Sequence, residues 1–346
     1  MKSESHRIIY RGDKVPLFQS KLYETESAAL QSPMIDIVIA QNRNSGLVEN
    51  VGFDYGLMKY DQDYNNDQSQ SLVFQNHLSS VSKLITELMP RFNFLEIGCG
   101  KGKFMEFLEA KGCTVFGYDP SYTGNKKNIV KNYYSGEYSC EKTNVVMRHV
   151  LEHIPNPIKF LEGIKGSCKS GYIYIEVPSL EWIIKNNSWY DFTGEHCNYF
   201  TLDFFHSIFE KIIFSEFTFG SQYISIIADL DSLRSPEIIA EKVEVPNTFG
   251  PPSSFDSYSG DFNFVWGAAG KGVIFCNLAS RAGLKIANVV DINPDKVGKR
   301  IPGTGHLVSG PHDFCREKNG NIFVMNRVYL DEIRALCGDS FNFILV

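Results

Sequence analysis

Leu95-Glu96-Ile97-Gly98-Cys99-Gly100-Lys101-Gly102 is the stretch that decides the fold of this chain. It follows an apolar strand pattern over residues 92–97 and precedes a helix pattern over residues 103–111. Glycines are needed where a backbone turns sharply and lets a ligand approach without a Cβ atom in the way. The stretch therefore predicts a strand, a ligand-binding turn and a helix in that order.

An acidic residue follows this turn at the sequence distance expected for a residue that binds ribose. The next strand pattern, residues 114–118, is followed by Asp119-Pro120, which places the acid 119 − 100 = 19 positions after Gly100. Such an acid accepts hydrogen bonds from ribose hydroxyls. Dinucleotide sites use the spacing GxGxxG, whereas Gly98, Gly100 and Gly102 have the spacing typical of S-adenosylmethionine sites. We expect that cofactor; a plain glycine loop in an α/β protein is the alternative.

The surrounding pattern extends the α/β assignment to most of the chain. Short apolar strands alternate with helices through residue 177, which predicts a parallel sheet built from βαβ units. Two apolar runs, 213–219 and 223–228, are joined so tightly that only an antiparallel hairpin fits. This is the organisation of class I methyltransferases, with a Rossmann-like, mostly parallel sheet that ends in a hairpin. The sequence suggests four stretches: a small N-terminal module (1–70), the methyltransferase domain (71–245), a Pro/Ser/Gly-rich linker (246–261) and a C-terminal Rossmann-like α/β domain (262–346).

Composition excludes several classes of protein. The 346 residues carry 34 Lys and Arg against 40 Asp and Glu, a net charge of −6, which disfavours a nucleic-acid partner or an anionic membrane surface. The eight cysteines form no CxxC pair, and no apolar run is long enough for a signal peptide or a membrane span. We expect a cytoplasmic enzyme with a small-molecule substrate. The oligomeric state is left open, and a monomer is compatible with the sequence.

The third strand pattern ends in Arg148-His149-Val150-Leu151-Glu152-His153. Side chains at the carboxyl end of a parallel strand face the ligand crevice, so we expect His149, Val150 and Leu151 to border the adenosine and the methyl group. We assign Glu96, Pro120 and Arg148 to the cofactor site as well. The two histidines suggest a metal ion, but the spacing spans a strand end and supplies too few ligands, so no metal is expected.

Several ordered motifs resemble the deoxysugar C-methyltransferase family, whose members methylate carbon 3 of nucleotide-linked 4-keto-6-deoxyhexoses. They are RHVLEHIPNP (148–157), EVPSLEW…YDFTGEHCNYFT (176–201), VWGAAGKG (265–272) and VVDINPDKVGKRIPGT (289–304). The similarity covers roughly residues 50–346. It implies a sugar nucleotide bound between the methyltransferase domain and the C-terminal domain.

Carbon methylation requires a base beside the carbon and a group that stabilises the enolate. In the family, the pair that matches Glu195-His196 carries the catalytic histidine, which implies His196 as the base. Glu195 can orient the imidazole or hold the substrate, and Tyr199 can donate a hydrogen bond. The alternative is that Glu195 and His196 cap the helix that follows. Substrate contacts are also expected from Glu176, Pro178 and Asn198.

Tyr60, Tyr64, Gln68 and Ser71 follow helical spacing and correspond to the family helix that closes over cofactor and substrate. Tyr64 is a candidate catalytic residue, and the other three are candidate cofactor contacts; a solvated polar helix face is the alternative. The chain departs from the family in two respects. Its first cysteine is Cys99, so it lacks the zinc-binding cysteines of the family's N-terminal module. Thr193 stands where the family often has tyrosine, which leaves oxygen methylation open as an alternative.

The C-terminal stretch Gly267-Ala268-Ala269-Gly270-Lys271-Gly272 is a degenerate dinucleotide motif, followed by Asp291 after the next strand. A two-domain Rossmann protein that binds NAD or a sugar nucleotide without methyl transfer is therefore an alternative. The family resemblance instead assigns this domain to the substrate. Lys271, Lys299 and Arg300 are candidate contacts to the diphosphate.

Overall fold

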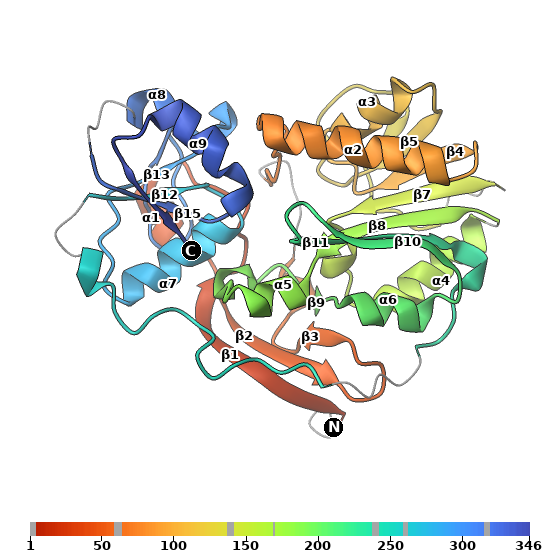
Figure 1. Cartoon of the computed structure of the whole chain (residues 1–346), viewed down its shortest axis with the longest axis horizontal. Coiled ribbons are helices and arrows are strands. Elements are labelled where there is room, and N and C mark those ends of the chain that lie inside the picture. The colour runs from red at the N-terminus through yellow and green to blue at the C-terminus, as the bar shows by residue number, and fades with distance from the viewer. Residues whose placement is uncertain are drawn as a thin grey trace.

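The chain folds around three β-sheets in the computed structural model (Figure 1). The structure describes residues 5–58, 64–136, 142–168, 170–236, 242–258, 262–314 and 319–346. Among these residues, no helix combines the length and apolar character needed to cross a bilayer.

The central sheet has seven strands in the order β10-β11-β8-β7-β4-β5-β6. Its strands are β4 (Asn93–Ile97), β5 (Val115–Tyr118), β6 (Ile129–Val130), β7 (Thr143–Arg148), β8 (Tyr172–Pro178), β10 (Ile212–Thr218) and β11 (Tyr223–Asp229). The pairs from β8 through β6 are parallel, and the hairpin β10–β11 adds to β8 in antiparallel register. This topology confirms the class I methyltransferase fold expected from the sequence.

Helices cover both faces of this sheet (Figure 1). The helices α2 (Leu72–Leu88) and α3 (Lys103–Glu109) lie on one face, and α4 (Pro157–Ser167) and α6 (Leu202–Ile208) lie on the other. Side-chain caps fix where three of them begin: Ser71, Asn156 and Thr201 each accept a backbone N–H of the first turn. Because Thr201 caps α6, the alternative that Glu195 and His196 cap this helix is wrong.

The expected helix through Tyr64, Gln68 and Ser71 is also wrong, because α2 begins only at Leu72. Asn65 and Asp67 accept backbone N–H groups two positions ahead, which favours turns over helix in this segment. Tyr60 lies outside the described residues.

The N-terminal residues supply three strands of a four-stranded sheet. It has the order β1-β2-β3-β9 and consists of β1 (His6–Pro16), β2 (Met34–Asn42), β3 (Val48–Asn50) and β9 (Asn198–Tyr199). The helix α1 (Glu26–Leu30) lies between β1 and β2. The fourth strand, β9, comes directly after the segment that carries His196 and pairs with β3. The N-terminal module is thus joined to the predicted active-site segment.

The C-terminal sheet is parallel and has the order β14-β13-β12-β15-β16, as a Rossmann-like domain requires. Its elements are β12 (Asn263–Trp266), α7 (Lys271–Arg281), β13 (Asn288–Val290), β14 (Val308–Ser309), α8 (Pro311–Phe314), β15 (Asn321–Val324), α9 (Leu330–Cys337) and β16 (Asn342–Leu345).

One apolar core connects the N-terminal sheet, the helix α5 (Leu180–Lys185) and the C-terminal sheet. Phe249 and Phe255, which belong to the expected linker, are buried in this core. The stretch therefore packs against its neighbours along part of its length and is not a free spacer. Figure 1 shows the N-terminal strands running below both of the other sheets.

Candidate active site

Two cavities meet at the carboxyl edge of the central sheet. The loop cavity, about 770 Å³, lies over the glycine loop of β4 and α3 and extends to Asp119. The inter-sheet cavity, about 220 Å³, lies between the central sheet and the C-terminal sheet and contains His196. His149 and His153 line both cavities. A ligand in one cavity can therefore reach a ligand in the other at these two histidines.

The glycine loop adopts the conformation that the sequence predicted. Gly98, Gly100 and Gly102 have φ values of 75°, 55° and 76°. A Cβ atom on Gly98 would lie 2.2 Å from Cγ2 of Val150, whereas one on Gly100 would meet nothing within 4 Å. Gly98 is needed for close packing, and Gly100 leaves open backbone at the cavity.

Asp119 is fixed beside this open backbone. Its Oδ2 accepts the N–H of Gly100 at 2.8 Å, and its Oδ1 accepts the N–H of Ser121 at 2.8 Å. The carboxylate and the neighbouring Pro120 line the loop cavity. A carboxylate held at the end of a strand, next to bare backbone, fits the ribose of S-adenosylmethionine.

The loop cavity also has aromatic walls that the sequence analysis missed. Tyr133, Tyr134 and Phe160 line it beyond Asp119. Burial raises the pKa of Tyr134 to about 12, so its phenol stays protonated. Their spacing in the sequence does not indicate a shared site, because Tyr133 and Tyr134 come from one loop and Phe160 from α4.

Glu96 lies at the base of the loop cavity and is only 2% exposed. Burial raises the pKa of its carboxyl to about 8, although the charge of Arg148 opposes this shift. Its Oε2 is buried without a hydrogen-bond partner. The group is therefore mostly protonated at neutral pH and can donate to a ligand.

A second buried glutamate, Glu176, holds the strand ends together. Its carboxylate lies 3.1 Å from Arg148 and 2.8 Å from Nε2 of His77, and it accepts the hydroxyl of Tyr174 at 2.9 Å. Burial opposes its ionisation, but Arg148, His149 and His77 together outweigh burial and hold the pKa of the carboxyl well below its usual range. We expected Glu176 to bind substrate. Because its carboxylate is fully enclosed by these partners, it instead supports Arg148, which does line the loop cavity.

His149 stands between the two cavities in a left-handed backbone conformation, with φ of 53°. Its Nδ1 lies 3.5 Å from Glu152, and its Nε2 lies 3.4 Å from Glu176. Burial opposes its protonation, but these two carboxylates outweigh burial and raise its pKa to about 9. His149 therefore places a positive charge where the two cavities meet.

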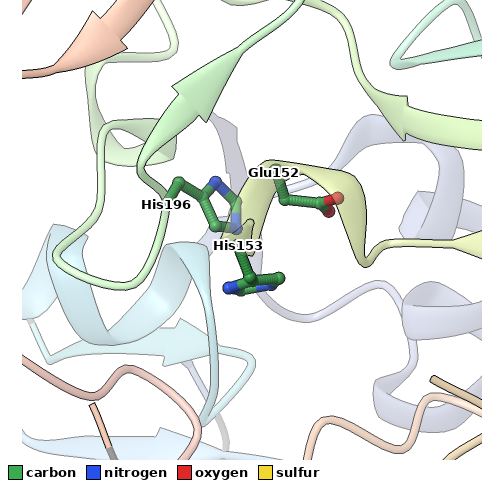
Figure 2. A group of neighbouring side chains, drawn as sticks. All are labelled: Glu152, His153 and His196. Carbon is green, nitrogen blue, oxygen red and sulfur yellow. The ribbon is translucent and has the colours of Figure 1, made fainter. Parts of the chain in front are cut away.

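His196 faces Glu152 and His153 across the inter-sheet cavity, as Figure 2 shows. The His153 and His196 ring centroids are 4.9 Å apart, with an edge-to-face arrangement. Burial, reinforced by the charge of His153, lowers the pKa of His196 to about 3, so its imidazole is neutral. Nδ1 of His196, Oε2 of Glu152 and Oγ1 of Thr193 are buried without hydrogen-bond partners. Unpaired polar atoms are costly, and their concentration here marks a site built for a ligand.

Glu195 does not orient His196 as expected. Its Oε1 accepts the backbone N–H groups of Gln19 at 2.5 Å and Ser20 at 3.2 Å, and its Oε2 accepts the hydroxyl of Tyr64 at 2.9 Å. Gln19 and Ser20 follow β1, and Tyr64 precedes α2, so the buried carboxylate turns toward the N-terminal part of the chain. Tyr64 itself lines the loop cavity, in agreement with a place in the active site.

Tyr199, Asn198 and Leu151 have structural roles that replace the expected ligand contacts. The hydroxyl of Tyr199 accepts the backbone N–H of Thr193 at 2.9 Å. The side-chain amide of Asn198 donates to the carbonyls of Leu151 and Ile154. Leu151 is fully buried in the core beneath the sheet. These contacts fix the turn that presents His196.

Lys271 forms the C-terminal wall of the inter-sheet cavity. Its Nζ lies 3.0 Å from Asp191 and 3.0 Å from Oε1 of Gln222, and it sits over the ring of Trp182 at 4.5 Å. Pro178 lines the same cavity.

The other expected contacts are distributed between the cavities. Gln68 lines both, and Lys299 lines the loop cavity. Ser71 lines the inter-sheet cavity, not the cofactor site, and donates to Glu332 at 2.6 Å. Arg300 lies elsewhere: its Nη1 donates to the carbonyl of Gly305 and lies 3.4 Å from Glu26, so the expected diphosphate contact is not supported.

Comparison with known proteins agrees with this geometry. The family model described as "Methyltransferase domain" matches residues 67–214. No curated protein sequence matches the chain.

Solved structures with partial likeness include three methyltransferases. The plantazolicin methyltransferase BpumL in complex with SAH is 17% identical, with 40% of this chain and 62% of that chain covered and a TM-score of 0.31. A SAM-dependent methyltransferase from Archaeoglobus fulgidus is 18% identical, with 45% and 93% covered and a TM-score of 0.33. The magnesium protoporphyrin IX methyltransferase from Synechocystis PCC 6803 is 13% identical, with 46% and 80% covered and a TM-score of 0.34.

The family match coincides with the central sheet, its glycine loop and the carboxylate of Asp119. Residues 67–214 are therefore a methyltransferase domain of the class I fold, and the chain is an enzyme whose methyl donor is S-adenosylmethionine.

Proposed function

We propose that this enzyme transfers a methyl group to carbon 3 of a nucleotide-linked 4-keto-6-deoxy sugar, with His196 as the base. The observation that carries the proposal is the meeting of the two cavities at His149 and His153. A donor over the glycine loop and an acceptor between the sheets would then face each other beside His196. The family resemblance of the sequence supplies the class of acceptor.

The C-terminal wall supports a phosphorylated acceptor. Gly267 and Gly270 have positive φ values, and a Cβ atom on either would meet nothing within 4 Å, so their backbone is open. They precede α7, an eleven-residue helix whose first residue is Lys271. Helix N-termini and lysine side chains both attract phosphate groups. Lys296, which lies 3.1 Å from Asp291, adds a second positive charge in the cavity.

The side chains around His196 support a carbon nucleophile. A neutral imidazole can accept the proton from carbon 3, and the nearby carboxylate of Glu152 would stabilise the imidazolium that forms. The unpaired hydroxyl of Thr193 can donate to the enolate oxygen, in place of the tyrosine that the family often has. S-Adenosylmethionine, when bound, supplies the electrophilic methyl group that the carbon attacks.

Solvent exchange tests the proposal directly. The enzyme is incubated in D2O with nucleotide-linked 4-keto-6-deoxy sugars and without cofactor, and deuterium at carbon 3 is measured by mass spectrometry. We expect exchange that disappears in His196→Ala, while S-adenosylhomocysteine still binds to that variant. Methyl transfer without any exchange would favour oxygen methylation. Binding of NAD but not of S-adenosylhomocysteine would overturn the proposal.

The state of the cysteines indicates the kind of cellular compartment in which the protein works. Six cysteines in the described residues form no disulfide bond, and four of these are buried. Free thiols persist in reducing compartments, which supports a cytoplasmic location.

A further inference from the structure

We infer that Glu152, His153 and His196 form a binding site for a divalent transition-metal ion such as Zn²⁺. One ligand atom from each residue lies within 4.8 Å of the other two. All three side chains line the inter-sheet cavity, and Figure 2 shows the His196 ring pointing toward the other two. Small side-chain rotations bring such atoms around one ion.

The donor set determines the class of ion. Two imidazoles and one carboxylate form the protein ligands of many catalytic zinc sites and of facial iron sites. Mg²⁺ and Ca²⁺ prefer sites made of oxygen ligands alone. The cluster is therefore suited to Zn²⁺ and its neighbours in the transition series.

Two features of the cluster favour a ligand over a purely structural role. Glu152 is only 2% exposed, so water does not reach its carboxylate, and its Oε2 has no hydrogen-bond partner. Nδ1 of His153 lies 3.0 Å from the backbone carbonyl of Glu195, which fixes the ring as outer-shell contacts do in metal sites. An ion would provide a partner for Oε2 of Glu152 and use the ring orientation that the His153 hydrogen bond provides.

The site has a direct consequence for catalysis, and this part rests on the proposed function. Three protein ligands leave one position of a tetrahedral ion open toward the cavity. A metal ion on His196 would take the lone pair that the base needs. Metal binding and proton abstraction at His196 therefore exclude each other, so bound Zn²⁺ inhibits turnover.

Calorimetric titration of the 346-residue chain with Zn²⁺ tests the site. We expect one site whose affinity falls at least 100-fold in His153→Ala and in His196→Ala, and Mg²⁺ should not bind there. His206→Ala is the control, because His206 is an exposed histidine on α6 and its loss should leave affinity unchanged. Binding of S-adenosylhomocysteine by each variant shows that it is folded.

The result also separates the site from the proposed function. Equal Zn²⁺ affinity in the wild type and in folded His196→Ala would overturn the site, since the ion would then be held elsewhere, for example by cysteine thiols. If the variants lose Zn²⁺ but saturating Zn²⁺ leaves wild-type turnover intact, the site stands and the role of His196 as base is refuted.

Discussion

The buried carboxyl of Glu96 makes the stability of the free enzyme depend on pH. Its pKa is about 8 in the folded protein, against 4.5 for an ordinary glutamate, and burial is the main cause. Between these values the folded protein holds a proton that the unfolded chain has lost, so stability falls as pH rises. A difference of 3.5 pH units at 1.36 kcal/mol per unit corresponds to about 5 kcal/mol, lost fully above pH 8.

Glu96→Gln removes this ionisation while keeping the size of the side chain. We expect the variant and the wild type to have similar free energies of unfolding near pH 4.5, and the variant to be several kcal/mol more stable at pH 8.5. Urea unfolding without cofactor, followed at pH 4.5, 6.5 and 8.5, measures the difference. Glu87→Gln is the control, because Glu87 is 61% exposed on α2. A difference between Glu96→Gln and the wild type that stays constant across pH would refute the reasoning.

Three further changes test the site. Asp119→Ala should weaken S-adenosylhomocysteine binding by about 1.5 to 3 kcal/mol, because ribose hydroxyls lose a charged acceptor; unchanged affinity in calorimetry would make the acid purely structural. Gly98→Ala should lower the thermal midpoint by several degrees, since its Cβ would meet Val150 at 2.2 Å and its φ is positive; a variant as stable as the wild type contradicts this. Glu195→Gln should lower the free energy of unfolding in urea by about 1 to 3 kcal/mol, because the new amide nitrogen would face a hydrogen-bond donor, the N–H of Gln19 or the hydroxyl of Tyr64. Glu195→Asp, which keeps the charge, is the comparison. An unchanged free energy of unfolding in Glu195→Gln would show that the donors reorient.

The sequence predicted the central sheet well because its signals are local. Strands buried on both faces read as apolar runs, as in β7 and β8. The glycine loop and Asp119 belong to one strand–turn–helix–strand unit, so their spacing alone brings them together. A sequence pattern typical of a strand was also present in the N-terminal sheet, because Ile35, Ile37 and Ile39 alternate with more exposed residues along β2.

The rest of the site depends on tertiary structure that spacing does not encode. Glu195 is adjacent to His196, yet it bonds to Gln19 and Ser20 because the N-terminal module brings their N–H groups to it. His153 and His196 meet although 43 positions separate them in sequence. For the same reason, the spacing of His149 and His153 along the chain could not indicate that His196 lies beside His153.

The pairing of β3 with β9 has a consequence for the order of events during folding. Val48 pairs with Tyr199, 199 − 48 = 151 positions along the chain, and this contact anchors the turn that carries His196. Long-range pairings form slowly because loop closure must precede them. The glycine loop, in contrast, contacts Asp119 across only 19 positions. During refolding from urea, we expect the ability to bind S-adenosylhomocysteine to return before turnover does, so that an early species holds the donor but cannot yet use it.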